Sequence, residues 1–289
     1  MNFLSKLFLP ITLPIKFIQN NFKTVLLLVV IYYIASSTDP KDMQVANLQI
    51  IELNGPILNP TDILEKIEKA KLDINIKGVL LSVNSPGGAV APSVEIAYAI
   101  KELNSIKPVV AYASGIMASG SYYSSIWATK ILANPGSMIG SIGVIMQSVD
   151  ASELLSKIGI KTQTVKMGTY KEAGTPTRQW TKEERTELEN ITKNTYDMFV
   201  SDVSSARKLK KEDHKLYADA HIFTASQAKE VGLIDDLATI SSAKILVIKL
   251  SGVSAPVWSK EDKMDKFIQK ILNGTVANIS NNVNGLVAY

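Results

Sequence analysis

The chain has 289 residues, of which 46% are hydrophobic and 20% charged, which is typical of one large or two small globular domains and excludes an intrinsically disordered chain. It contains no cysteine, which excludes disulfides, thiolate nucleophiles and zinc sites built from thiolates. The formal net charge of +4 is modest, and the sequence has no dense basic stripe with interleaved aromatic residues, which argues against nucleic-acid binding.

The first predicted element is a membrane segment. Val25–Ala35 is an unbroken apolar run that follows a leader containing lysines. It is shorter than the about 20 residues of a full span, so Lys23 would have to snorkel to the interface. Because the lysines precede the run, the rest of the chain is expected on the non-cytoplasmic side of a membrane. A cleaved signal peptide is the alternative, since small residues stand at 35–37. We predict an uncleaved anchor within residues 1–36 and a linker over 37–46.

The residues after this linker alternate between strand and helix patterns. Continuous apolar runs predict buried parallel strands, and the segments between them have helical patterns. The predicted strands are 48–53, 78–83, 109–113 and 131–133, and the predicted helices are 62–71, 93–103 and 119–128. This order indicates βαβ units and the α/β class.

The second half is predicted to be mainly helical. A capping box at Thr181 opens a long helix towards Arg207, and a second box at Thr224 opens a short one. The end of the chain, residues 241–289, has one apolar run at 245–250 and an Asn-rich tail, and we treat it as a C-terminal extension.

Two glycine-rich turns follow predicted strands. Residues 84–88, with the sequence NSPGG, lie between a strand and a helix. Consecutive glycines allow backbone N–H groups to converge on a negative oxygen, although a plain strand-to-helix turn explains the same pattern. Residues 136–143 form another glycine-rich segment, for which we expect close backbone packing near a site.

A serine at a predicted helix N-terminus is the candidate nucleophile. Ser119 follows the strand at 109–113, and unpaired N–H groups at a helix start stabilise nearby negative charge. An N-cap serine is the alternative interpretation. The pattern alone leaves four neighbouring serines as rivals, namely Ser114, Ser121, Ser124 and Ser125.

A serine nucleophile needs a base that takes its proton. The two histidines, His214 and His221, lie in a polar stretch without a motif, so lysine is the remaining base that suits a serine. A lysine acts as a base only where burial or a second cation lowers its pKa from about 10.4. Lys166 and Lys171 stand in a turn-like segment of small residues, although a solvated lysine is the ordinary interpretation for each.

The ordered motifs together resemble one family. NSPGG, IMASGSYY, GSIGV, KMGTYKEAGTPTRQWTKEE and ADAHIFTASQAKEVGLIDDL are similar to the signal peptide peptidase SppA type of serine protease in its short form. The resemblance implies a ClpP/crotonase-like domain over residues 47–240. It implies Ser119 as nucleophile, Lys171 as general base, and the N–H groups of Gly88 and Gly120 as the oxyanion hole.

The resemblance also implies the biological setting. It implies a membrane-bound homo-oligomer that degrades hydrophobic peptides such as cleaved signal peptides, with the Ser–Lys pair completed across a subunit interface. The expected location is the inner membrane, crossed once, with the catalytic domain on the non-cytoplasmic side and with no metal or cofactor. A crotonase-type CoA-thioester enzyme and a non-catalytic membrane scaffold are the alternatives.

Two positions depart from the family pattern. Ser121 stands where a glycine is usual, so its side chain is expected to narrow the site or to constrain φ. Ala220 and His221 stand where the family has Gly-Arg.

Overall fold

The computed structural model describes residues 20–28 and 45–259. The chain divides into two units, residues 1–45 and 46–289, which are considered separately. In the first unit, residues 22–28 are helical. Most of the predicted membrane run lies outside the described residues, and within the described ranges no helix has both the length and the apolar character needed to cross a bilayer.

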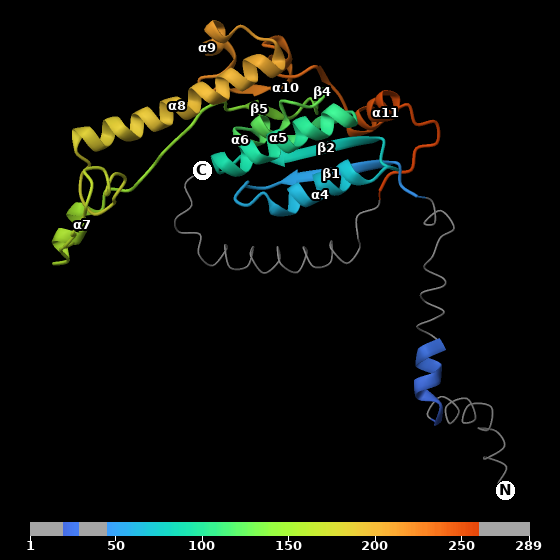
Figure 1. Cartoon of the computed structure of the whole chain (residues 1–289), viewed down its shortest axis with the longest axis horizontal. Coiled ribbons are helices and arrows are strands. Elements are labelled where there is room, and N and C mark those ends of the chain that lie inside the picture. Colours follow the sequence, from blue (N-terminus) through green and yellow to red (C-terminus); the bar gives the residue numbers. More distant parts are fainter. Residues whose placement is uncertain (1–19, 29–44, 260–289) are drawn as a thin grey trace. The chain divides into compact units, whose positions relative to one another are not determined.

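The second unit is built on a seven-stranded sheet (Figure 1). Its central strands run in the order β1-β2-β3-β4-β7 and are parallel, while β5 pairs parallel with β3 and antiparallel with β6. The strands are β1 Leu48–Asn54, β2 Gly78–Ser85, β3 Val109–Ala118, β4 Lys130–Ala133, β5 Met138–Gly140, β6 Ile222–Thr224 and β7 Asp236–Leu237. The predicted α/β class and βαβ connections are confirmed.

Helices cover both faces of the sheet, which explains why its central strands are apolar throughout. One face of β2 contributes Val79 and Leu81 to the larger core, while Leu80 points to a smaller core on the opposite face. The larger core includes residues of α4 Thr61–Leu72, α5 Val90–Ile106 and α6 Gly120–Ser125.

The smaller core is closed by α11, Ile240–Ser251, whose Ala243 and Val247 are fully buried. The sequence places these residues at the start of a C-terminal extension. In the structure they cover the second face of the sheet, so the packed domain continues through this helix.

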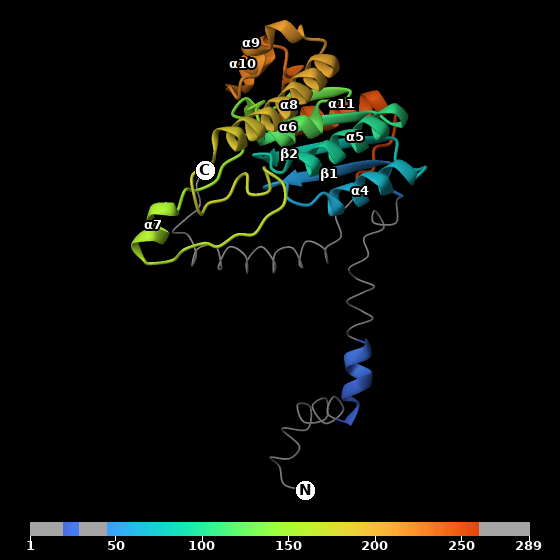
Figure 2. The same cartoon turned by 60° about the vertical axis from the view of Figure 1, so that its left-hand side comes forward.

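The longest helix among the described residues, α8 Lys182–Arg207, extends beyond the edge of the sheet at its N-terminal end (Figure 1). Thr181 caps α8, and Glu184 completes the predicted capping box. Residues 145–181, here called the arm, include α7 Ser152–Lys157 and lie around the N-terminal end of α8 (Figures 1 and 2). The C-terminal end of α8 packs into the larger core through Phe199. The remaining helices are η2 Lys211–Asp213, α9 His214–Tyr217 and α10 Ala225–Glu230.

Candidate active site

Ser119 occupies a strained turn between β3 and α6. Its φ of 52° and ψ of −125° are rare for a residue with a side chain, and such conformations cost about 1–3 kcal/mol. The Ser119 N–H donates to the carbonyl of Gly140 at 2.8 Å, which holds the turn against the end of β5. Strain of this kind persists where the surroundings impose it, and it concentrates at functional sites.

The Ser119 hydroxyl makes no hydrogen bond with any described residue, unlike the hydroxyls of its neighbours. Ser119 is the N-cap residue of α6, but its side chain makes no capping hydrogen bond, so the N-cap alternative does not account for it. Ser121, Ser124 and Ser125 are fully buried and donate to backbone carbonyls. The exposed Ser114 donates to the Val83 carbonyl. Of the five serines, only Ser119 lines the cavity beside the turn.

Ser121 does not narrow that cavity. Its hydroxyl donates to the Ser85 carbonyl at 2.6 Å and accepts the Ala118 N–H at 2.9 Å. The side chain therefore points into the protein and joins the ends of β2 and β3 just behind Ser119. The departure from the usual glycine adds a structural link and leaves the cavity unobstructed.

Ser121→Ala is expected to lower the free energy of unfolding by about 1–3 kcal/mol, because the buried Ala118 N–H loses its acceptor. Thermal or urea unfolding of the variant measures this loss. Ser114→Ala removes a hydroxyl from an exposed position and serves as the control. Equal stability of the two variants would contradict the structural role of Ser121.

The NSPGG turn packs directly against the Ser119 turn. A Cβ at Gly87, where φ is +96°, would lie 2.6 Å from the Gly120 nitrogen, and one at Gly88 would lie 2.2 Å from the Ile57 carbonyl oxygen. Real Cβ atoms do not approach other atoms so closely, so both positions require glycine. The segment is thus more than a plain strand-to-helix turn, since its backbone forms one wall of the site.

Two backbone N–H groups beside Ser119, one from the NSPGG turn and one from α6, are available to a ligand. Ile57 donates to Gly87 and accepts from Ala89, which leaves the N–H of Gly88 facing away from Ile57. Gly120 is the first residue of α6, and the first N–H groups of a helix have no intrahelical acceptor. Gly88 and Gly120 line the same cavity as Ser119. Free N–H groups beside a nucleophile are the arrangement that stabilises an oxyanion.

The cavity itself is small and largely apolar. Its volume is about 30 Å³. Its lining residues are Gly88, Val90, Ser93, Val94, Ser119, Gly120, Tyr123, Gly143, Val144, Thr195, Met198 and Phe199. This set contains the Ser119 hydroxyl and two backbone N–H groups but no lysine, histidine or carboxylate. Within the part of the chain that the structure describes, no candidate base lines the cavity.

The two candidate lysines differ in their partners. Lys166 forms an ion pair with Glu172 at 2.8 Å and lies 4.0 Å from Glu184, so carboxylates already hold its amine. Lys171 is exposed and makes no ion pair or side-chain hydrogen bond with any residue that the structure describes. Only Lys171 is thus free to act elsewhere. It lies in the arm and does not line the Ser119 cavity of its own chain.

An ion network holds the arm to the start of α8. Arg178 bonds both oxygens of Glu184 and also reaches Glu172. Hydrogen bonds, first from Lys166 and then from other donors, lower the pKa of Glu172 to about 2. Hydrogen bonds from Arg178 and from the Thr181 N–H lower the pKa of Glu184 to about 2. The network fixes the segment that carries Lys171.

We expect the arm to loosen in acid. Folding lowers the pKa of Glu172 and Glu184 from an ordinary value of about 4.5. The stability that their ionised carboxylates give to the arm is therefore complete above about pH 4.5, and it is lost as the pH falls towards about 2. Hydrogen exchange of residues 160–181 at pH 6 and pH 3 measures the change. Glu184→Gln should lower the protection at pH 6 and reduce its dependence on pH. Protection of these amides that does not change with pH in the native chain would contradict the prediction.

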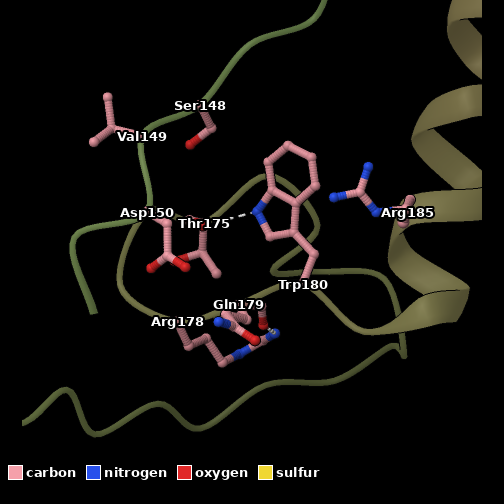
Figure 3. A pocket seen from close by; sticks show the side chains of 8 residues that line it. All are labelled: Ser148, Val149, Asp150, Thr175, Arg178, Gln179, Trp180 and Arg185. Atoms are coloured by element: carbon pink, nitrogen blue, oxygen red, sulfur yellow. Dashed lines mark hydrogen bonds between the residues drawn. The ribbon is translucent and has the colours of Figure 1, made fainter. Parts of the chain in front are cut away.

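A larger cavity of about 310 Å³ lies in the arm (Figure 3). In the close-up, Trp180 lies between Thr175 and Arg185, and its ring nitrogen donates to the Thr175 carbonyl. Arg178 is bound by carboxylates, and Asp150 accepts from Ser152. These polar groups are thus already paired, mostly with residues beside the cavity, and we assign the cavity no chemistry.

The two histidines lie outside the Ser119 cavity. His221 is exposed, and His214 Nδ1 lies 2.9 Å from the hydroxyl of Tyr196. The expectation that neither is the base agrees with these positions. The cavity residues from α8, Thr195, Met198 and Phe199, have no sequence signal, because only the tertiary fold brings α8 beside α6.

Comparison with known proteins identifies related chains. Residues 101–254, more than half of the chain, match the model of Peptidase family S49. A "Putative protease" of Methanocaldococcus jannaschii is 41% identical over 68% of this chain and 62% of its own length. A second, from Synechocystis, is 36% identical over 70% of this chain and 74% of its own. Protease 4 of Salmonella typhi is 30% identical over 78% of this chain and 37% of its own length.

The fold is similar to that of a solved protease. The structure of 1510-N, a membrane-bound stomatin-specific protease, matches with a TM-score of 0.51 and 14% sequence identity, over 76% of this chain and 100% of that chain. At this identity the match shows the fold alone.

Proposed function

This chain belongs to peptidase family S49, and from this premise we propose that it is a serine endopeptidase with Ser119 as nucleophile and Lys171 as general base. The observation that carries the proposal is the free hydroxyl of Ser119 on a strained turn, beside the unpaired N–H groups of Gly88 and Gly120. Nucleophiles of hydrolases are often presented on such turns.

The residues divide the reaction between them. The Lys171 amine takes the proton of the Ser119 hydroxyl as its oxygen attacks the peptide carbonyl, and the Gly88 and Gly120 N–H groups donate to the oxyanion that forms. The protonated amine then gives its proton to the leaving nitrogen, and the C–N bond breaks to leave an acyl-enzyme. Lys171 next takes a proton from the water that attacks the ester, and it gives this proton to the Ser119 oxygen as the ester bond breaks, which restores the hydroxyl and the neutral amine.

The proposal places the Lys171 of a second copy at each Ser119. Among the described residues of one chain, no base lines the cavity, while Lys171 stands exposed in the arm. Val165 and Met167, on the same segment, are 102% and 92% exposed. In the proposed assembly these apolar side chains are covered by the second copy. Burial against another copy would also supply the desolvation that a lysine base requires.

We further propose that the enzyme is a single-pass membrane protein of the inner membrane that acts on hydrophobic peptides, including cleaved signal peptides. The sequence supports the anchor through the Val25–Ala35 run and the lysines before it, which would leave the catalytic domain on the non-cytoplasmic side. The apolar residues around the Ser119 cavity, such as Val94 and Phe199, suit apolar substrate side chains. Flotation of the full chain with vesicles tests the anchor.

A fluorophosphonate probe tests the nucleophile. We expect it to label the assembled protein at Ser119, located by mass spectrometry, and to leave Ser119→Ala unlabelled. The buried Ser121, Ser124 and Ser125 provide internal controls, because they are already hydrogen-bonded. Labelling at another serine, or none in an assembly that hydrolyses peptides, would overturn the assignment.

A further inference from the structure

Several residues with a strained backbone conformation lie close together behind Ser119. Among the described residues, five other than glycine have positive φ. Four of them are Ser119, Ser141, Asp219 and Ala220. Residues with side chains adopt this conformation only where the surrounding structure imposes it. Three segments distant in sequence are thus forced into rare conformations at one site.

Hydrogen bonds connect these strained residues in series. The Ser119 N–H donates to Gly140, and the Ser141 N–H next to it donates to the His221 carbonyl at 2.7 Å. In return, the Ala220 N–H donates to Ile142 at 2.9 Å. The turn at residues 219–221 therefore supports the 140–142 segment, which in turn holds the backbone of Ser119.

The 219–221 turn also packs closely against the segment that ends at Gly143. A Cβ at Gly143 would lie 2.8 Å from the Cβ of Ala220, and Gly143 lines the Ser119 cavity. Any movement of the 219–221 turn would thus be passed to the cavity wall. Ala220 has a φ of 57°, a conformation that only glycine adopts without cost. With alanine there, something else must hold the turn.

That support comes from α8. The Tyr196 hydroxyl accepts the Asp219 N–H at 3.1 Å, and its own proton is available for His214 Nδ1. Burial raises the pKa of Tyr196, which keeps the hydroxyl protonated. His214 also meets the Tyr196 ring edge-on, with centroids 5.7 Å apart, and so fixes its orientation.

We propose that Tyr196 is a positioning residue for the peptidase reaction, which holds the strained 219–221 turn and through it the backbone of Ser119. Tyr196 touches no reacting atom. It acts by keeping the Gly120 N–H, next to Ser119, aligned with the oxyanion. Its effect on activity rests on the proposed function, but its effect on the turn does not.

Tyr196→Phe removes the hydroxyl and keeps the ring. We expect kcat of the assembled enzyme to fall at least about tenfold with KM within about twofold, because misalignment near the nucleophile affects the transition state more than binding. Tyr217→Phe is the matched control, since Tyr217 also bonds a backbone group at 3.1 Å, the Lys210 carbonyl, but not the turn. Its kcat should stay within about twofold of the native value.

A rescue separates positioning from general destabilisation. In Tyr196→Phe/Ala220→Gly, glycine adopts the positive φ of position 220 without strain, so most of the lost kcat should return. A structural defect unconnected with the turn would not respond to this change. Native kcat in Tyr196→Phe, an equal loss in Tyr217→Phe, or a double variant no better than Tyr196→Phe would each overturn the proposal.

Hydrogen exchange tests the turn without using activity. Amides of Asp219 and Ser141 should exchange faster in Tyr196→Phe than in the native chain, and at the native rate in Tyr217→Phe. Unchanged exchange in Tyr196→Phe would refute the support role. Hydrolysis that persists in Ser119→Ala would instead refute the proposed function, so the two failures are distinguishable.

Discussion

Ser119→Ala is expected to reduce peptide hydrolysis at least about 10³-fold, because the covalent route is lost and only the oxyanion donors remain. The free energy of unfolding should be unchanged. The Ser119 side chain makes no hydrogen bond with the residues that the structure describes, and its backbone has a strained conformation that alanine would share. Initial rates on a fluorogenic apolar peptide measure activity, and thermal unfolding measures stability.

Ser114→Ala provides the control for this result. Ser114 belongs to the same strand-to-helix segment, but it is exposed and donates to the Val83 carbonyl. Its activity should stay near the native value. Substantial hydrolysis by Ser119→Ala, or an equal loss in Ser114→Ala, would mean that another group is the nucleophile.

Mixing two inactive variants is expected to restore activity. Ser119→Ala keeps the base, and Lys171→Ala keeps the nucleophile. If each site takes its serine from one copy and its lysine from the next, random assembly of equal amounts gives about one quarter of the native sites. A site formed within one chain would gain nothing, because every chain lacks one of the two groups.

The exchange of subunits has to be verified. The variants are mixed after dissociation and reassembled, and each variant alone, treated in the same way, gives the baseline. Separately assembled oligomers of Ser119→Ala and of Lys171→Ala, combined without dissociation, are the matched control, because no site in them can hold both groups. Failure of Ser119→Ala and Lys171→Ala to complement, in oligomers shown to be mixed, would contradict the shared dyad.

Local patterns predicted much of the fold. The apolar run at 78–83 predicts a strand covered on both faces, and β2 is such a strand. The capping boxes at Thr181 and Thr224 predict helix starts at the correct residues, because their signals need only neighbours in sequence. By contrast, the helix predicted over 119–128 ends at Ser125, and the unassigned run at 245–250 belongs to α11.

The choice of Ser119 needed more than local pattern. Five serines within a few residues look equivalent in sequence, and the resemblance to a family selected one of them. The structure separates them physically, since burial and backbone acceptors occupy Ser121, Ser124 and Ser125 while the Ser119 hydroxyl stays unbonded. Lys171 is distinguished from Lys166 in the same way, by the carboxylates that bind only Lys166.

The sequence by itself determined the α/β class, the starts of α8 and α10 and the glycines beside the candidate site, because each depends on local conformation or on the burial pattern of one segment. Only the tertiary structure decided which serine is free, that α8 lines the cavity beside α6, and that Lys171 stands apart from the Ser119 of its own chain. These features depend on contacts between residues tens of positions apart. No periodicity or spacing encodes such contacts, since they arise when separate helices pack on one sheet.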